Sequence, residues 1–229
     1  MTRLRCDLFL VLLAGLALPG ASLPACAQQK PDSLVRLPKA RVTGSMPVEA
    51  ALATRRSQRS LAETPLAVAE VGQLAWAAQG VTGAGGKRTA PSAMARYPLE
   101  LYLVVGAAEG LAPGVYRYVP AEHALVVVAK ENRKPAMAAA ANNQPSVARA
   151  PLVLVFATKP GARVAATGPV DPWTAIEVGA AVQNVYLQAT SLGLGTVAVG
   201  SFQEPATAGL LALTPGQRIV LVMPVGHPQ

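Results

Sequence analysis

Three arginines and a serine lie within five residues of one another, at Arg55-Arg56-Ser57-Gln58-Arg59. A guanidinium group holds a phosphate through two parallel hydrogen bonds, and a hydroxyl group adds a further donor. The cluster therefore has the composition of an anion site, although a solvated group of surface charges has the same composition. No helix-turn-helix or aromatic RNA-binding motif accompanies it, so a nucleic-acid site is not indicated.

Other side-chain chemistry is poorly represented. The two histidines, His123 in an expected solvated turn and His227 near the C-terminus, have neither metal-ligand spacing nor a serine nucleophile beside them. The glycine-rich stretch at 83–87 lacks the spacing of a phosphate loop, because Arg88 and Thr89 follow it. The sequence thus predicts no metal site. It indicates either an organic cofactor that carries the chemistry or a protein that is not an enzyme.

The first 27 residues resemble a signal peptide. Arg3 and Arg5 precede an apolar run at 8–18, and Ala25-Cys26-Ala27 provides small residues for cleavage after Ala27. The run is too short to span a bilayer. Lipidation of Cys26 is one alternative, and an uncleaved N-terminal anchor is another. We expect an exported protein of the periplasm or cell envelope, with peripheral or lipid-anchored membrane association as an alternative to a freely diffusing form.

Composition and cysteine usage narrow the functional classes. With 52% hydrophobic and 14% charged residues, the chain is unlike a disordered protein. Both cysteines, Cys6 and Cys26, belong to the leader or its edge, so no thiolate nucleophile, redox pair or thiolate metal site is expected in the mature domain. The net charge of +8 fits an anionic ligand or an anionic membrane surface near the basic stretch at 30–41.

Residues 28–46 are predicted as an arm or linker and residues 47–229 as one domain. The predicted helices cover residues 47–56, 64–80, 133–142, 174–192 and the region of 210–211. The predicted strands cover residues 99–105, 115–119, 124–128, 152–157, 197–199 and 219–225. Because the second and third strands form a hairpin, the fold class is α+β rather than a doubly wound parallel sheet.

Two of the predicted helices carry further information. In the helix that ends at Gly80, the glycine fits the left-handed position after a helix end, and Trp76 is expected in the core. Between Thr174 and Leu192 the single charged residue is Glu177. A helix that is apolar or small around its circumference is buried, so this one is expected at the centre, in part against a second subunit.

Eight short motifs resemble the flavin-dependent nitroreductase superfamily, and within it the azoline (thiazole/oxazole) dehydrogenase-like branch. The resemblance covers about residues 47–227. Each motif alone is weak, but the order of all eight along the chain makes the resemblance specific. The first is the arginine cluster at 55–59. The others are WAAQG at 76–80, TAPSA at 89–93, YPLELY at 97–102, GVYRY at 114–118, QNVYL at 183–187, LGLGTV at 192–197 and PVG at 224–226.

The resemblance implies an α+β sandwich, with a central mixed or antiparallel sheet flanked by helices, that forms a homodimer and binds FMN in two interface sites. It implies three groups of flavin contacts. The flavin phosphate and pyrimidine edge are contacted by Arg55, Arg56, Ser57 and Arg59. The loop that reaches the isoalloxazine ring from the other subunit contains Pro91, Ser92 and Ala93. The segment along the ring near its reactive nitrogen contains Ala198, Val199, Gly200 and Ser201.

The sequence departs from the family at several positions. Ala95 and Gly200 stand where nitroreductases proper usually carry Asn and Glu, whereas Met94 stands where the azoline branch usually has glycine. The stretch at 163–169 lacks the adjacent Lys-Tyr pair of the azoline enzymes, so peptide azoline oxidation is not expected. Many relatives continue into a basic C-terminal segment that grips the phosphate, whereas this sequence ends at Gln229, so we expect Arg55 and its neighbours to carry more of that role.

The expected function is that of an exported FMN-dependent oxidoreductase. It would transfer a hydride through the flavin to or from a small planar molecule, such as a quinone or a nitroaromatic. The sequence identifies no side chain as an acid or a base. Two alternatives are an FMN-binding or storage protein without turnover, and a pseudoenzyme without FMN that has a structural role in the cell envelope.

Overall fold

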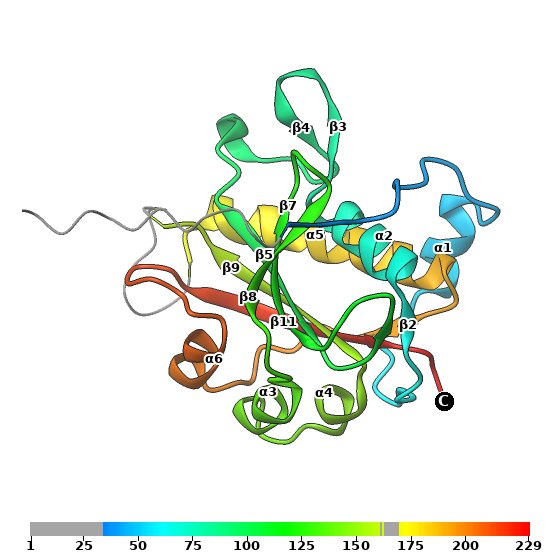
Figure 1. Ribbon diagram of the computed structural model, residues 1–229. Helices are drawn as coiled ribbons and strands as arrows, with labels where there is room; N and C mark the ends of the chain where they lie inside the picture. Colours follow the sequence, from blue (N-terminus) through cyan, green and yellow to red (C-terminus); the bar gives the residue numbers. More distant parts are fainter. Residues whose placement is uncertain (1–33, 161, 163–169) are drawn as a thin grey trace, which may run out of the picture. The chain divides into compact units, whose positions relative to one another are not determined.

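An antiparallel sheet of seven strands lies at the centre of the fold (Figure 1). The computed structural model describes residues 34–160, 162 and 170–229; the expected leader, residues 28–33 of the expected arm and the stretch at 163–169 lie outside these residues. The strand order is β1-β8-β7-β5-β9-β11-β10, and every neighbouring pair is antiparallel. The strands of the sheet are β1 (Leu34–Arg36), β5 (Leu99–Val105), β7 (Gly114–Val119), β8 (Ala124–Ala129), β9 (Leu152–Thr158), β10 (Gly195–Thr196) and β11 (Ile219–Gly226).

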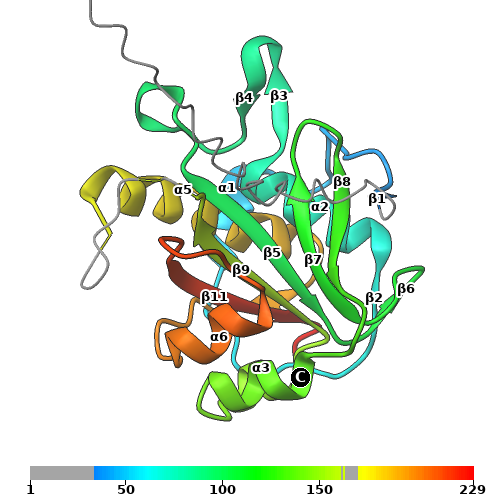
Figure 2. The ribbon, with the colours of Figure 1, turned by 60° about the vertical axis from the view of Figure 1, so that its left-hand side comes forward.

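Helices cover both faces of this sheet, which confirms the α+β class. One face packs on α2 and α5, and the opposite face packs on α3, α4 and the end of α6; Figure 2 shows α3 and α6 on that second side. The helices are α1 (Val48–Thr54), α2 (Val68–Gln79), α3 (Lys134–Ala140), α4 (Pro145–Arg149), α5 (Pro172–Ser191) and α6 (Glu204–Leu210). Two small sheets pair β2 (Leu66–Ala67) with β6 (Ala108–Glu109), and β3 (Val81–Gly83) with β4 (Lys87–Arg88).

The central strands are apolar on both sides because both sides are covered. In β9, Leu152, Leu154 and Phe156 pack on the α2 and α5 side, while Val153 and Val155 pack on the other side. Successive side chains of a strand point to opposite faces, so a strand buried on both faces is a continuous apolar run. The predicted bounds of five strands agree with those of β5, β7, β8, β9 and β11 to within one residue at each end.

The strand predicted at 197–199 is wrong. The sheet ends earlier, at β10, and Val199 forms only an isolated bridge with Val222. Between them the backbone N–H of Ala198 donates to the Tyr186 hydroxyl at 2.7 Å and not to β11. A side chain of α5 thus takes the hydrogen bond that would have continued the ladder.

The start of α2 and the end of α1 also differ from prediction. Leu66 and Ala67 pair with β6, so α2 begins at Val68 and not near Thr64. The Glu70 carboxylate accepts the Ala67 N–H at 2.8 Å, which satisfies one of the donors that a helix start leaves open. The helix α1 ends at Thr54, so Arg55 and Arg56 lie in extended chain beyond it.

Gly80 is required for space and not for a left-handed turn. Its φ is −64°, so the expected left-handed conformation is wrong. A Cβ atom at this position would lie 2.1 Å from Cδ1 of Trp76. Trp76 itself is half-buried, which differs from the core position expected for it. Its ring folds back over the helix end, so any side chain at position 80 would displace the ring from this place.

Substitution of Gly80 by alanine is expected to lower the free energy of unfolding by roughly 1 kcal/mol, at the low end for overpacking. The indole must turn away from the new methyl group, and the partly exposed ring has room to do so. Urea unfolding followed by far-UV circular dichroism measures the change. Gly209→Ala is the control, because a Cβ there meets nothing within 4 Å; equal effects in both variants would contradict the explanation.

His123 is an anchor for the N-terminal arm, which corrects its expected role as a solvated turn residue. Its Nδ1 lies 2.9 Å from the Tyr118 hydroxyl and its Nε2 lies 2.9 Å from the Pro38 carbonyl oxygen. The Leu37 N–H donates to the His123 carbonyl oxygen at 3.1 Å. Together with β1, which pairs with β8, these contacts fix part of the stretch predicted as an arm.

The long helix α5 confirms only part of its expected burial. Val178, Val185 and Ala189 are buried against the sheet and α2, but Trp173 and Ile176 are each 61% exposed in one copy of the chain. Within the described residues, no helix is both long and apolar enough to cross a membrane.

Candidate functional site

The chain after α1 lies alongside β10 and brings the arginine cluster to one edge of the sheet. Ser57 forms a parallel bridge with Thr196, and the Gln58 N–H donates to the Thr196 carbonyl oxygen at 2.9 Å. Segments separated by about 140 residues of sequence thus become neighbours. The first and third groups of predicted contacts, at 55–59 and 198–201, meet at this edge.

Tyr186 of α5 ties these two groups together. Its hydroxyl lies 3.2 Å from Ser57 Oγ and accepts the Ala198 N–H at 2.7 Å. The Arg55 guanidinium lies over its ring, 5.0 Å from the centroid. Either hydroxyl group can be the donor between Tyr186 and Ser57. Ser57 is exposed, so its hydroxyl group is accessible to a ligand.

The three arginines differ in how they are used. Arg56 donates from one nitrogen to the carbonyl oxygens of Ala53 at 3.1 Å and Arg55 at 2.7 Å, so it caps the end of α1. Of the ion pairs formed between described residues, none includes Arg55, Arg56 or Arg59. Arg55 therefore presents unneutralised charge next to Ser57 at Tyr186, and the exposed Arg59 adds a second such charge two residues after Ser57. These residue types suit a phosphate.

The segment at 198–201 is fixed at two points and open between them. Val199 exchanges two backbone hydrogen bonds with Val222, at 2.9 and 3.0 Å. Ser201 is held by the side chains of Asn142 and Gln144. Ala198 and Gly200 are exposed, and a Cβ added at Gly200 would meet nothing within 4 Å. These small residues leave backbone that a flat ring could approach closely.

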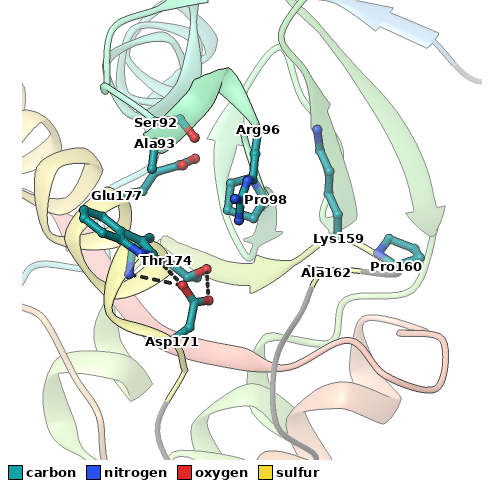
Figure 3. Close-up of a pocket in the computed structure, with 11 residues that line it drawn as sticks. Ser92, Ala93, Arg96, Pro98, Lys159, Pro160, Ala162, Asp171, Thr174 and Glu177 are labelled. Carbon is teal, nitrogen blue, oxygen red and sulfur yellow. Dashed lines mark hydrogen bonds between the residues drawn. The ribbon is translucent and has the colours of Figure 1, made fainter.

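The loop at 91–93 lies elsewhere, where Ser92 and Ala93 line a cavity with a volume of about 660 Å³ (Figure 3). Ser92 Oγ accepts the Tyr97 N–H at 2.8 Å. Met94, which directly follows the loop at 91–93, has a φ of +55° and is 81% exposed. This left-handed conformation favours glycine, so the glycine of the azoline branch suits the backbone here and the methionine is strained. The cavity is lined by Ser92, Ala93, Arg96, Pro98, Lys159, Pro160, Ala162, Asp171, Trp173, Thr174 and Glu177.

Glu177 is a buried acid that faces this cavity. The residue is 2% exposed, and its Oε1 atom has no hydrogen-bond partner among the described residues. Burial raises the pKa of the Glu177 carboxyl, against the opposing effects of the Ser92 hydroxyl, Arg88 and Lys159. The protonated, uncharged form is therefore favoured more than in water.

Two cations lie near Glu177, and neither is a simple surface charge. Arg88 donates to Gln79 Oε1 at 2.5 Å, and its guanidinium stacks on Tyr97 at 4.5 Å from the ring centroid. Burial lowers the pKa of Arg88; burial, followed by the charge of Arg88, lowers the pKa of Lys159. Figure 3 shows Lys159 across the cavity from Glu177.

One copy of the chain does not bring all three predicted groups together. Tyr186 and Glu177 are nine residues apart on α5, which places them about 14 Å apart along the helix axis. The groups at 55–59 and 198–201 lie at the Tyr186 end, and the loop at 91–93 lies at the Glu177 end.

The described residues contain no cluster of three His, Cys, Asp or Glu side chains suited to a metal ion.

Three residues of these sites are not among the site residues predicted from the sequence. Glu177 does carry a signal, since it is the single charge in a long apolar helix, but the apolar pattern of that helix predicts only its burial. Tyr186 lies in the QNVYL motif, which carries no chemistry in the sequence itself. Lys159 follows a buried strand without any distinguishing pattern.

The chain matches the nitroreductase family over residues 52–227. A Methanocaldococcus jannaschii protein classed with the nitroreductases is 40% identical over 181 residues, which are 79% of this chain and 90% of that protein. A solved structure from Ralstonia eutropha, also classed as a nitroreductase, has a TM-score of 0.71 at 28% identity and covers 92% of this chain and 96% of its own.

A third solved structure, from Desulfovibrio desulfuricans, is a nitroreductase-class protein in complex with FMN. It has a TM-score of 0.57 at 22% identity and covers 80% of this chain and 87% of its own, which shows the shared fold. The family match extends over most of the chain, and the archaeal relative is 40% identical over nearly its own full length. The chain therefore belongs to the nitroreductase family of oxidoreductases.

Proposed function

We propose that this protein binds FMN between two copies of the chain and transfers a hydride to or from a small planar molecule of the quinone or nitroaromatic type. The observation that carries the proposal is the convergence of Arg55, Ser57 and Ala198 on Tyr186, next to the open segment at 198–201. Unneutralised guanidinium groups and the Ser57 hydroxyl group suit the phosphate, and small residues suit the ring.

The roles of the chain's own residues follow from their contacts. Arg55 and Arg59 would hold the phosphate, while Arg56 supports them by capping α1. Tyr186 orients Ser57 and Ala198 and places Arg55 over its ring. When bound, FMN supplies the group that accepts and donates the hydride. The FMN-bound structure from Desulfovibrio desulfuricans, which has this fold, supports the choice of flavin.

A second copy of the chain is part of the proposal for two reasons. The loop at 91–93 and the phosphate cluster lie at different points of α5, so one copy holds only portions of a flavin site. The exposed Trp173 and Ile176 lie one helical turn apart on α5, and an apolar patch of this kind is typical of an interface. A homodimer would bring the loop of one copy to the phosphate cluster of the other.

Export is proposed from the leader pattern at residues 1–27. Expression of the full chain in a bacterial host, followed by fractionation and N-terminal sequencing, tests it. Cleavage after Ala27 with the protein in the periplasmic fraction is expected. Lipidation of Cys26 would instead place it in the membrane fraction, and full-length protein in the cytoplasm would contradict export.

The visible absorption spectrum of the purified protein, before and after addition of FMN, tests the proposed function. We expect a bound-flavin spectrum that is bleached by a reductant and restored by duroquinone, a tetramethyl-1,4-benzoquinone. Tight FMN binding without turnover of any donor and acceptor pair would support a storage protein. A colourless protein that cannot be reconstituted would leave a pseudoenzyme with a structural role.

A further inference from the structure

The cavity of Figure 3 adjoins the loop that the proposed function places at the flavin ring. Ser92 and Ala93 of that loop form one part of its wall, and the first turns of α5 form another. Pro98, Pro160 and Trp173 add apolar surface. A cavity of about 660 Å³ that combines this apolar surface with polar and charged side chains has room for a small polar molecule with a flat ring.

Glu177 is the carboxyl group of this cavity that has hydrogen-bonding capacity to spare. The other described acid in the wall, Asp171, caps α5: it accepts from the Trp173 and Thr174 N–H groups at 3.1 and 3.2 Å and from the Thr174 hydroxyl at 2.5 Å. Glu177 instead has an Oε1 atom without a partner, although the residue is 98% buried. A buried polar atom without a partner is costly, so such an atom at a cavity points to a ligand that satisfies it.

The charged groups around Glu177 come from several elements. Arg88 approaches from β4, Lys159 from the end of β9, and Arg96 and Asp171 share the cavity wall. Burial outweighs the two cations that act on Glu177 and raises the pKa of its carboxyl group. The group is thus able to give up a proton, and Lys159 and Arg88 then stabilise the carboxylate that remains.

On the basis of the proposed flavin chemistry, we propose that Glu177 is the proton donor to a quinone bound in this cavity, with Lys159 on the opposite wall. One quinone oxygen accepts a hydrogen bond from the Glu177 carboxyl group and then its proton. The other takes a hydride from the reduced flavin, and the product is a hydroquinone. The Glu177 carboxylate recovers a proton from water, so two electrons and two protons are accounted for.

Binding of duroquinone to the flavin-free protein tests the cavity independently of FMN. Trp173 lines the cavity, so quenching of its fluorescence reports binding, and a Trp173→Phe variant should lose the signal. Glu177→Gln keeps a hydrogen-bond donor and should bind duroquinone within about 3-fold of the wild type. Glu177→Leu removes the donor and should bind about 10-fold more weakly. Equal affinity in the wild type and the leucine variant would overturn the proposal.

Turnover by the FMN-loaded protein tests the proton transfer. In Glu177→Gln the rate constant for duroquinone reduction should fall about 100-fold, while FMN affinity stays unchanged. The wild-type rate should decline as the pH rises through the pKa of Glu177, because only the protonated acid donates, and this decline should be missing in the glutamine variant. Glu109→Gln, an exposed position on β6, is the matched control and should behave as the wild type.

An unchanged rate and pH profile in Glu177→Gln would overturn the role of Glu177 and leave the flavin site intact. A wild-type protein that fails to bind FMN would overturn the proposed function instead, and the proton-transfer step with it. Circular dichroism of each variant identifies a folding defect, and the glutamine variant, which preserves size, then decides the result.

Discussion

Replacement of Ile176 by aspartate is expected to convert the proposed dimer to a monomer. Ile176 is 61% exposed in one copy, as is Trp173 one turn earlier on the same face of α5. An aspartate there would bury a carboxylate without a partner if the dimer formed, at a cost of several kcal/mol. We expect the dissociation constant of the dimer to rise by at least about 100-fold, which corresponds to roughly 3 kcal/mol.

The same variant should lose FMN together with the second copy. The loop at 91–93 and the arginine cluster lie beside different parts of α5, near Glu177 and Tyr186 respectively, so the monomer would retain only one set of contacts to each flavin. Sedimentation velocity with detection at protein and flavin wavelengths measures both losses at once. Ala136→Asp, an exposed position on α3 beneath the opposite face of the sheet, should change neither. A monomeric wild type that binds FMN fully would contradict this assembly.

The sheet was predictable because its strands carry their own signal. Strand β9 is buried on both faces, and β5 and β11 are buried along most of their length, so each is a mainly apolar run, interrupted in β5 by Glu100, whose limits are visible in the sequence. The strand β1 was not predictable from its own residues. Leu34, Val35 and Arg36 are held by pairing with β8 and by His123, and neither contact leaves a periodic pattern in the arm.

The candidate site was predictable only as far as single segments reach. The residue types of the arginine cluster indicate an anion site, and the resemblance orders the motifs around a flavin. The hydrogen bonds of Tyr186 to Ser57 and Ala198 depend on three segments meeting in space. The unpartnered oxygen of Glu177 is also a tertiary property, because burial and the positions of neighbouring groups determine it. Composition contains neither kind of information.

Substitution of Arg55 by alanine is expected to weaken FMN binding by about 1.5–3 kcal/mol, the value for loss of a charged hydrogen bond. This corresponds to roughly a 10- to 150-fold rise in the dissociation constant. The side chain stacks on Tyr186 and has no acidic partner among the described residues, so its removal takes charge from the site without freeing a buried acid. Titration of the flavin-free protein with FMN, followed by quenching of flavin fluorescence, measures the change.

Comparison with the neighbouring arginine separates charge in general from a specific contact. The Arg56 guanidinium is already engaged with the Ala53 and Arg55 carbonyl oxygens, so Arg56→Ala should weaken FMN binding less than Arg55→Ala and should chiefly loosen the end of α1. Arg149→Ala, which removes an exposed arginine 4.0 Å from Glu63, should leave the affinity unchanged. If all three variants weakened binding equally, the effect would be one of net charge, and the assignment of Arg55 to the phosphate would be wrong. The salt dependence of FMN affinity gives a second comparison. Dissolved salt screens the attraction between an arginine and the phosphate, so FMN affinity should fall most steeply with added NaCl in the wild type and less steeply in Arg55→Ala.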